Sequence, residues 1–298
     1  MSRKCGFKSV RETLAASLAA GLFCVAALSS VLGAEEARDA IPNFSAPGVS
    51  WELDNPFSDL TNSEFLPVPG DPGPGPVRQH PDYPYDGDIT RRMADTSNPI
   101  LQPSVKEQMD VEVARVLEGM QARSSTGIPF IPTSRCWPGG VPGLHLYTAA
   151  VQYLQTPDQV WLLSNRGELR RVYLNVPHSD EPGFSWYGES VGHYENGDTL
   201  VIDTIGLDDK GPIDRLNTPH SRQLHVVERH RLIQDGERMR VTIHVIDPGV
   251  FTMPWNAMVE YARVSGSWHE WICAENAGDY HFSAGALVPI PSDDMPDF

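Results

Sequence analysis

The sequence predicts a mainly β domain, an antiparallel barrel or sandwich of lipocalin-like form, with one N-terminal amphipathic helix and an extended proline-rich arm. Short runs rich in β-branched and aromatic residues recur in the second half of the chain, and turn sequences such as Asn-Arg-Gly at 165–167 separate them. The runs cover residues 144–155, 159–164, 169–176, 199–205, 224–232, 239–246 and 258–264. Short strands joined by tight turns, without helices between them, are typical of antiparallel sheets that close or stack.

The first 34 residues have the layout of a secretory signal peptide. Basic residues at positions 3, 4, 8 and 11 precede an apolar run at 14–32, and the small pair Gly33 and Ala34 ends it. The same run is just long enough to span a bilayer, so an uncleaved anchor is the alternative. We therefore expect an exported protein, periplasmic or secreted, with no integral membrane association after the signal is removed.

An arm and a helix are expected to precede the β runs. Prolines crowd positions 67–84, and proline is excluded from helix and sheet interiors, so residues 35–100 predict an extended arm. After Pro103, apolar residues recur at helical spacing up to residue 120, which predicts an amphipathic helix. Together with the β runs, this helix gives a single β-rich domain over residues 101–298.

Charge and cysteine content limit the partners and the compartment. The formal net charge is −16, and removing the basic signal makes it more negative. Such a surface repels phosphate backbones and anionic lipid, so no nucleic acid partner is expected. No glycine-rich phosphate loop or dinucleotide fingerprint is present, which argues against a nucleotide cofactor. Outside the signal, Cys136 and Cys273 are expected to form a disulfide, with two separately buried thiols as the alternative.

Three histidines near strand ends are the leading candidates for a site. His178 ends one predicted strand, while His220 and His225 bracket the start of another. A neutral imidazole can act as a general base near neutral pH or bind a metal. The spacing fits no compact zinc motif, so a site for one divalent metal ion would have to be assembled by the fold. Separate structural roles for each histidine are the alternative.

Carboxylates in the neighbouring runs could orient these imidazoles. Glu189 and Asp203 are the candidates, and alternation with apolar neighbours suggests that Asp203 points into a barrel lumen. Alternation also places Glu228 and His230 on one strand face. If that face is the core, both need partners. A Glu228 paired with an arginine such as Arg171 would be structural, whereas an unpaired Glu228 beside His178 would be catalytic.

Aromatic residues close to these polar groups suggest the wall of a small-molecule pocket. They lie in or next to predicted turns, and we assign Trp137, Trp186, Tyr187 and Tyr194 to substrate binding. Arg229 joins them, because alternation places it on the same strand face as His225. Simple packing of loops over a barrel mouth is the alternative.

The pentapeptide Gly-Glu-Ser-Val-Gly at residues 188–192 matches the nucleophile elbow of α/β-hydrolases. That elbow requires a helix after the serine, but here Ser190 is followed by a turn sequence and another predicted strand. Glycines that serve a tight turn are therefore the favoured interpretation, and a serine esterase acting through Ser190 is kept as an alternative.

Several longer motifs resemble a family of exported, largely uncharacterised bacterial proteins. They are Ser-Arg-Cys-Trp-Pro-Gly-Gly at 134–140, Ser-Trp-Tyr-Gly-Glu-Ser-Val-Gly-His-Tyr at 185–194, Gly-Asp-Thr-Leu-Val-Ile-Asp-Thr-Ile-Gly at 197–206, Pro-His-Ser at 219–221, Leu-His-Val-Val-Glu-Arg at 224–229 and Cys-Ala-Glu-Asn at 273–276. The resemblance covers roughly residues 98–298. It implies that His178, His220 and His225 belong to the family pattern while Glu189 varies, and it carries no activity over to this chain.

The leading expectation is an exported enzyme, a lyase, hydratase or hydrolase, that acts on a small organic molecule. His178, His220 and His225 would form its polar centre through acid/base or metal-assisted chemistry, with Asp203 or Glu189 orienting one imidazole. One alternative is a periplasmic binding protein that uses the same pocket without turnover. Another is an interaction module, which would show an exposed apolar patch and no concave pocket.

Overall fold

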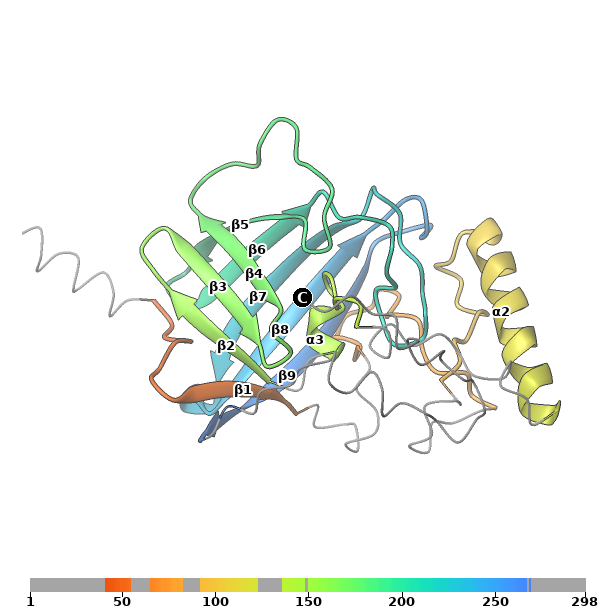
Figure 1. The fold of residues 1–298 in the computed structure, drawn as a ribbon, viewed down its shortest axis with the longest axis horizontal. Coiled ribbons are helices and arrows are strands. Elements are labelled where there is room, and N and C mark those ends of the chain that lie inside the picture. The colour runs from red at the N-terminus through yellow and green to blue at the C-terminus, as the bar shows by residue number, and fades with distance from the viewer. Residues whose placement is uncertain are drawn as a thin grey trace, which may run out of the picture. The chain divides into compact units, whose positions relative to one another are not determined.

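Within the part of the chain that the structure describes, nine strands form a closed barrel (Figure 1). The structure is a computed structural model, and it describes residues 41–54, 65–82, 92–122, 136–147, 150–266 and 268. Its strands are β1 (Val49–Leu53), β2 (Ala150–Gln155), β3 (Gln159–Ser164), β4 (Leu169–Leu174), β5 (Glu189–Glu195), β6 (Thr199–Ile205), β7 (His225–Ile233), β8 (Arg238–Ile246) and β9 (Trp255–Ser265). The mainly β prediction is confirmed, and the structure is a barrel rather than a sandwich.

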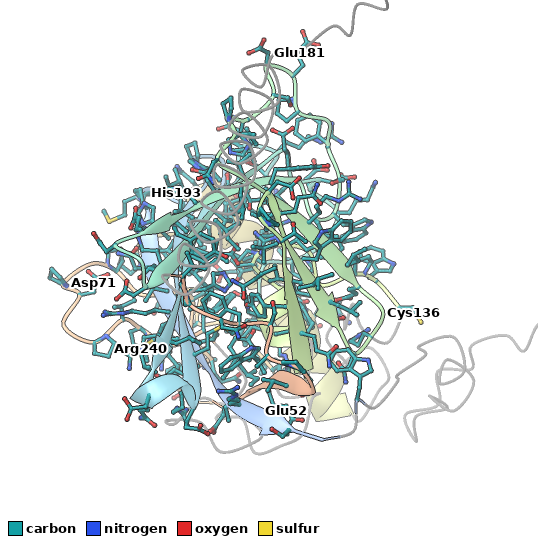
Figure 2. The ribbon with its side chains drawn as sticks, turned by 90° about the vertical axis from the view of Figure 1, so that its left-hand side faces the viewer. Glu52, Asp71, Cys136, Glu181, His193 and Arg240 are labelled. Atoms are coloured by element: carbon teal, nitrogen blue, oxygen red, sulfur yellow. The ribbon has the colours of Figure 1, made fainter. Side chains whose placement is uncertain are left out.

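One pair of neighbouring strands, β4 and β5, runs parallel, whereas the other described pairs are antiparallel. A parallel pair needs a long connection that returns to the starting end of the first strand. Residues 175–188 supply it, and the tip of this loop, marked by Glu181, stands away from the strands (Figure 2). The returning segment carries His178 to the start of β5.

Part of the range predicted as an arm is barrel wall. β1 falls within residues 35–100 and pairs with both β2 and β9, which closes the sheet. Phe44, Trp51, Phe65 and Ile100 in the same range are almost fully buried. Proline and glycine exclude long regular elements here, but five residues are enough for a strand when both of its edges are paired.

The predicted amphipathic helix is present as α2 (Pro103–Ala122), which buries Val105, Met109 and Val116. The start of the predicted strand at 144–155 is wrong, because Leu144–Tyr147 forms the short helix α3 before β2 begins. A Cβ at Gly143 would lie 2.3 Å from the Gly139 carbonyl oxygen, so the loop before α3 folds back more tightly than a strand allows. No described helix is long and apolar enough to cross a membrane.

Strand alternation divides the barrel wall into an inner and an outer face. Most inward positions are apolar, as in β8, where Met239, Val241, Ile243 and Val245 are fully buried. β7 differs, because its inward positions include Glu228 and His230, which are also fully buried. The barrel therefore contains polar side chains inside the hydrophobic core, and these must be paired there.

The tight turns expected from the sequence join several of the strands. Asn196 and Gly197 both have positive φ between β5 and β6, as the central residues of a type I′ turn do, and the Asp198 N–H donates to the Glu195 carbonyl oxygen over 3.2 Å. The short 3-10 turn η4 (Gln234–Gly236) connects β7 to β8, also through positive φ angles. These turns fix the register of the strands that carry the polar residues.

Candidate functional site

Four of the predicted site residues lie together on the outer face of the barrel. We call His178, Glu189, Asp203 and His225 the outer cluster. Asp203 was expected to point into the lumen, and this is wrong. In β6 the inward positions are Leu200, Ile202 and Thr204, which are fully buried, while 37% of the Asp203 side chain is exposed. The β6 run is apolar on both faces near its centre, so alternation alone gave the wrong face.

The outer cluster converges on one oxygen atom. Asp203 Oδ1 lies 3.0 Å from Nε2 of His178 and 2.8 Å from Nε2 of His225. On the other side of its ring, His178 Nδ1 lies 3.0 Å from Oε1 of Glu189. Carboxylates therefore hold the His178 ring from both edges, and His225 is held from one.

Ser179 completes the support of Glu189. Its backbone N–H donates to Glu189 Oε1 over 2.8 Å, and its hydroxyl donates to Oε2 over 2.7 Å. These two bonds come from the returning segment between β4 and β5, whereas Glu189 opens β5. The loop is thus attached to the strand beside the site, and the attachment fixes the position of His178.

The charges of the outer cluster reinforce one another. Burial acts to raise the pKa of Asp203, but hydrogen bonds from His225 and His178 outweigh it and lower that pKa. The bond to Asp203 raises the pKa of His225 against the opposing effect of burial. The Ser179 hydroxyl is the largest cause of the lowered pKa of Glu189. Both carboxylates are therefore ionised near neutral pH and act as acceptors.

His220, the third predicted histidine, has no described contact with His178 or His225. Its Nδ1 lies 3.2 Å from the Ser221 carbonyl oxygen, and burial lowers its pKa. The neighbouring charges that act on it belong to Asp247, Asp208 and Asp209 rather than to Asp203. A metal held jointly by His178, His220 and His225 remains a prediction that these contacts do not support.

The predicted aromatic wall is brought together only in part. Trp137 and Trp186 meet edge to face with ring centroids 5.6 Å apart. Tyr187 follows Trp186 and is partly buried, which raises its pKa. Tyr194 lies near the other end of β5, where its hydroxyl accepts a hydrogen bond from Gln155.

Arg229 lies on the outer face of β7, as predicted, but it is directed at another residue. Its Nε lies 3.6 Å from a carboxylate oxygen of Glu195, and 46% of its side chain is exposed. Glu195 is at the far end of β5 from Glu189. Arg229 is therefore separated from His225 along the same strand face.

Ser190 faces the inside of the barrel rather than a histidine. Its hydroxyl is buried and bonds to Arg170 Nε at 3.2 Å and to the Thr204 hydroxyl at 2.9 Å. No imidazole nitrogen is among its described contacts, and β5 continues after it without a helix. The geometry gives Ser190 no base, so the residues around it do not support the esterase alternative.

A second polar group, the inner network, fills the inside of the barrel. Arg170 of β4 donates to both carboxylate oxygens of Glu228, through Nη1 at 3.0 Å and through Nη2 at a shorter distance. Arg170 also donates to Thr204 over 2.8 Å. The expectation that a buried Glu228 needs a partner is confirmed. Of the two alternatives the structure shows pairing with an arginine, but this is Arg170 and not Arg171, which lies on the outer face over Trp161.

Two buried histidines complete the inner network, and both are held by tyrosines. His145 of α3 places Nε2 2.6 Å from Glu228 Oε1 and Nδ1 2.7 Å from the Tyr261 hydroxyl. His230 of β7 places Nδ1 2.8 Å from the Tyr153 hydroxyl. Among the described residues, the nitrogen and oxygen atoms of His145, Glu228 and His230 are the group of three that lie within 4.8 Å of one another and could hold a metal ion.

His145 and Arg170 were not identified from the sequence. His145 stands in a predicted strand where it resembled an ordinary polar position. The requirement that buried Glu228 and His230 find partners was visible, and a search for unassigned histidines and arginines in the remaining runs would have included both residues. Which of these histidines and arginines point into the barrel depends on how the barrel closes. Local sequence patterns do not determine that closure.

The predicted disulfide stays a prediction. Cys136 is described, with a positive φ of 55° at the start of the loop that leads to α3. Cys273 lies outside the described residues.

The chain was compared with protein-family models, curated proteins and solved structures. Neither protein-family models, nor curated proteins, nor solved structures give a match to this chain. Function is therefore inferred from the geometry of the outer cluster and of the inner network.

Proposed function

We propose that the protein is an enzyme that transfers protons to and from a small organic molecule at the outer cluster, as a lyase, hydratase or hydrolase. The observation that supports this most directly is the convergence of two imidazole Nε2 atoms on Asp203 Oδ1. An ionised carboxylate that fixes an imidazole by one nitrogen leaves the other nitrogen free to exchange a proton with substrate or water.

His225 is the proposed general base. Because Asp203 is an acceptor, Nε2 of His225 carries the hydrogen in their bond, and Nδ1 holds a lone pair when the ring is neutral. The His225 side chain is 35% exposed, so a small molecule can reach it. After Nδ1 takes a proton, Asp203 stabilises the resulting imidazolium, which agrees with the raised pKa of His225.

His178 and Glu189 are proposed to position Asp203. His178 bridges the two carboxylates, and Ser179 holds Glu189 from the same loop. Removing His178 would free Asp203 Oδ1 to rotate away from His225. We therefore expect the His178→Ala variant to lose turnover through a misplaced base rather than through lost contact with substrate.

A comparison of variants on a substrate panel tests the proposal. Small esters, lactones, hydroxy acids and unsaturated acids are incubated with the protein, and gain or loss of one water is followed by mass spectrometry. The matched control is His193→Ala, which removes an exposed histidine from the outer face of β5 (Figure 2).

The outcomes separate the proposed function from its rival. Turnover that is lost in His225→Ala and kept in His193→Ala supports the enzyme. A ligand that binds and is recovered unchanged supports a binding protein without turnover. Equal turnover in wild type and His225→Ala would remove His225 from the reaction and contradict the assignment.

A further inference from the structure

The inner network contains a buried ring nitrogen that no described residue contacts through a hydrogen bond. His230 is fully buried, and its Nε2 has no hydrogen-bond partner among the described residues. Burial of a polar atom without a hydrogen-bond partner destabilises the folded state. Its other nitrogen is engaged by Tyr153 over 2.8 Å, so the ring cannot turn to satisfy Nε2 without losing that bond.

Two further residues offer donor atoms close to His230. One ring nitrogen of His145, one oxygen of Glu228 and one ring nitrogen of His230 all lie within 4.8 Å of one another. The rings of His145 and His230 are 5.6 Å apart. From these positions we infer that His145, Glu228 and His230 form a binding site for one divalent transition-metal ion inside the barrel.

The tyrosines supply the orientation that metal-binding histidines need. A ligating imidazole usually bonds through its second nitrogen to a fixed partner, which sets the tautomer and the direction of the ligand atom. Here the Nδ1 atoms of both histidines meet buried tyrosine hydroxyls, at 2.7 Å for His145 and 2.8 Å for His230. When each Nδ1 carries the ring hydrogen and donates it to the tyrosine oxygen, each Nε2 presents its lone pair as the ligand atom. For His145 this replaces the present contact of Nε2 with Glu228 Oε1 at 2.6 Å.

The charges of the donors suit a cation. Glu228 accepts hydrogen bonds from Arg170 on both of its oxygens, as an ionised carboxylate does, and His230 Nε2 has no hydrogen-bond partner among the described residues. On binding, the hydrogen of the His145 ring moves from Nε2 to Nδ1, and the contact of Nε2 with Glu228 Oε1 is replaced by a bond from each atom to the ion.

Arg170 determines which ions the site prefers. Its guanidinium already neutralises Glu228, so the carboxylate is a weakened ligand and the two imidazoles supply most of the coordination. Imidazole suits Zn²⁺, Fe²⁺, Cu²⁺ and Ni²⁺, whereas Mg²⁺ and Ca²⁺ require several oxygen ligands. The site should therefore take up a nitrogen-preferring ion and leave Mg²⁺ and Ca²⁺ in solution.

The placement of the ligands indicates what the ion does. His145 comes from α3, while Glu228 and His230 come from the wall strand β7. The side chains of His145 and Glu228 are 1% and 0% exposed, so the ion would be enclosed. It would attach α3 to the barrel wall, and it would enter as the protein folds rather than after closure.

Metal analysis of the tag-free protein tests the inference. The wild type is refolded with Zn²⁺ or Co²⁺, freed of loose ions by gel filtration and analysed for bound metal, and a folded sample is incubated with the same ions. We expect near-stoichiometric metal after refolding, little uptake by the folded sample, and visible absorption bands from Co²⁺ bound to nitrogen and oxygen.

Variants then locate the ion. We expect the metal to be lost in His145→Ala and His230→Ala and kept in His225→Ala. It should also be kept in His244→Ala, which removes a partly buried histidine bonded to Asn256 on the adjoining strands. If the first two variants fail to fold, His230→Gln keeps a polar side chain of similar size opposite Tyr153 and replaces them.

Three results would overturn the inference. The first is a wild type that binds no metal by either route, which needs no variant. The second is metal retained in a folded His230 variant. The third is metal lost in His225→Ala and kept in His145→Ala, which would place the ion at the outer cluster instead. Because this last result would favour metal-assisted chemistry at that cluster, the failure of this inference and that of the proposed function are distinguishable.

Discussion

Replacing Arg170 by methionine should destabilise the barrel strongly, because it leaves a carboxylate buried without its counter-ion. Both side chains are almost fully buried, at 1% exposed for Arg170 and 0% for Glu228. Glu228 Oε1 keeps its bond to His145, but Oε2 loses its described partner. Breaking one side of a buried pair costs about 3–5 kcal/mol. For a chain of this size that loss lowers Tm by roughly 6–20 °C.

The pH dependence of the loss gives a second readout with a definite sign. In the wild type the pKa of folded Glu228 is lowered, so its contribution to stability is present above its unfolded pKa and is lost as the pH falls. Without Arg170, burial raises the pKa of folded Glu228 above its unfolded value. The variant therefore loses stability as the pH rises from the unfolded pKa through the folded pKa. The difference between wild type and variant should therefore shrink as the pH falls toward about 4.3, the ordinary pKa of glutamate.

Denaturant unfolding in the presence of a chelator, followed by tryptophan fluorescence, measures these differences. The control is Arg231→Met, whose partner Asp198 is exposed and whose ion pair should contribute at most about 1 kcal/mol. The double variant Arg170→Met with Glu228→Gln should recover a large part of the loss, because no charge stays buried. An Arg170→Met variant that loses no more stability than Arg231→Met would contradict the role of Arg170 as the counter-ion of Glu228. So would a double variant that is less stable than Arg170→Met alone.

Two further predictions concern the outer cluster and the turn before β5. Asp203→Asn should lower the pKa of His225 below its ordinary value, because the effect of burial is then no longer opposed by the bond to Asp203. NMR titration of His225 checks this, and the control Asp198→Asn, in a distant turn, should leave the pKa of His225 unchanged. Gly188→Ala should lower the free energy of unfolding, measured with denaturant, clearly more than Gly167→Ala. Both glycines have positive φ, but only a Cβ at Gly188 would lie 2.3 Å from a carbonyl oxygen. Equal losses in the two variants would contradict this prediction. The strain of positive φ alone is about 1–2 kcal/mol.

The sequence predicted elements well where patterns are local. β3 and β6 begin and end at the predicted residues, and the helix that begins at Pro103 differs by two residues at its end. Turn residues and side-chain alternation determine such elements within a few positions. β1 was missed because a five-residue strand among prolines and glycines has too little pattern of its own, and its strand form depends on pairing with β9.

The candidate site shows the same division between local and global information. Alternation on β7 correctly grouped Glu228 with His230 and His225 with Arg229. Alternation does not determine which face of β4 or β6 points inward. For this reason the predicted partner of Glu228 is Arg171 instead of Arg170, and Asp203 is predicted in the lumen. Both strands carry apolar residues on their outer faces, such as Leu169 and Val201, which hides the inward face until the barrel is assembled.

The pairing of β1 with β9 joins the two ends of the barrel sequence, Val49 beside Ser265. During synthesis β1 leaves the ribosome first, and its second partner is made only after every other strand of the barrel. Until then β9 is absent and β1 and the growing sheet both present unpaired backbone, the template on which chains associate with one another. Contacts this distant in sequence also close slowly. The nascent chain therefore passes through a long interval in which it is most exposed to aggregation, and a chain shortened from its N-terminus past Leu53 would retain that exposed edge permanently.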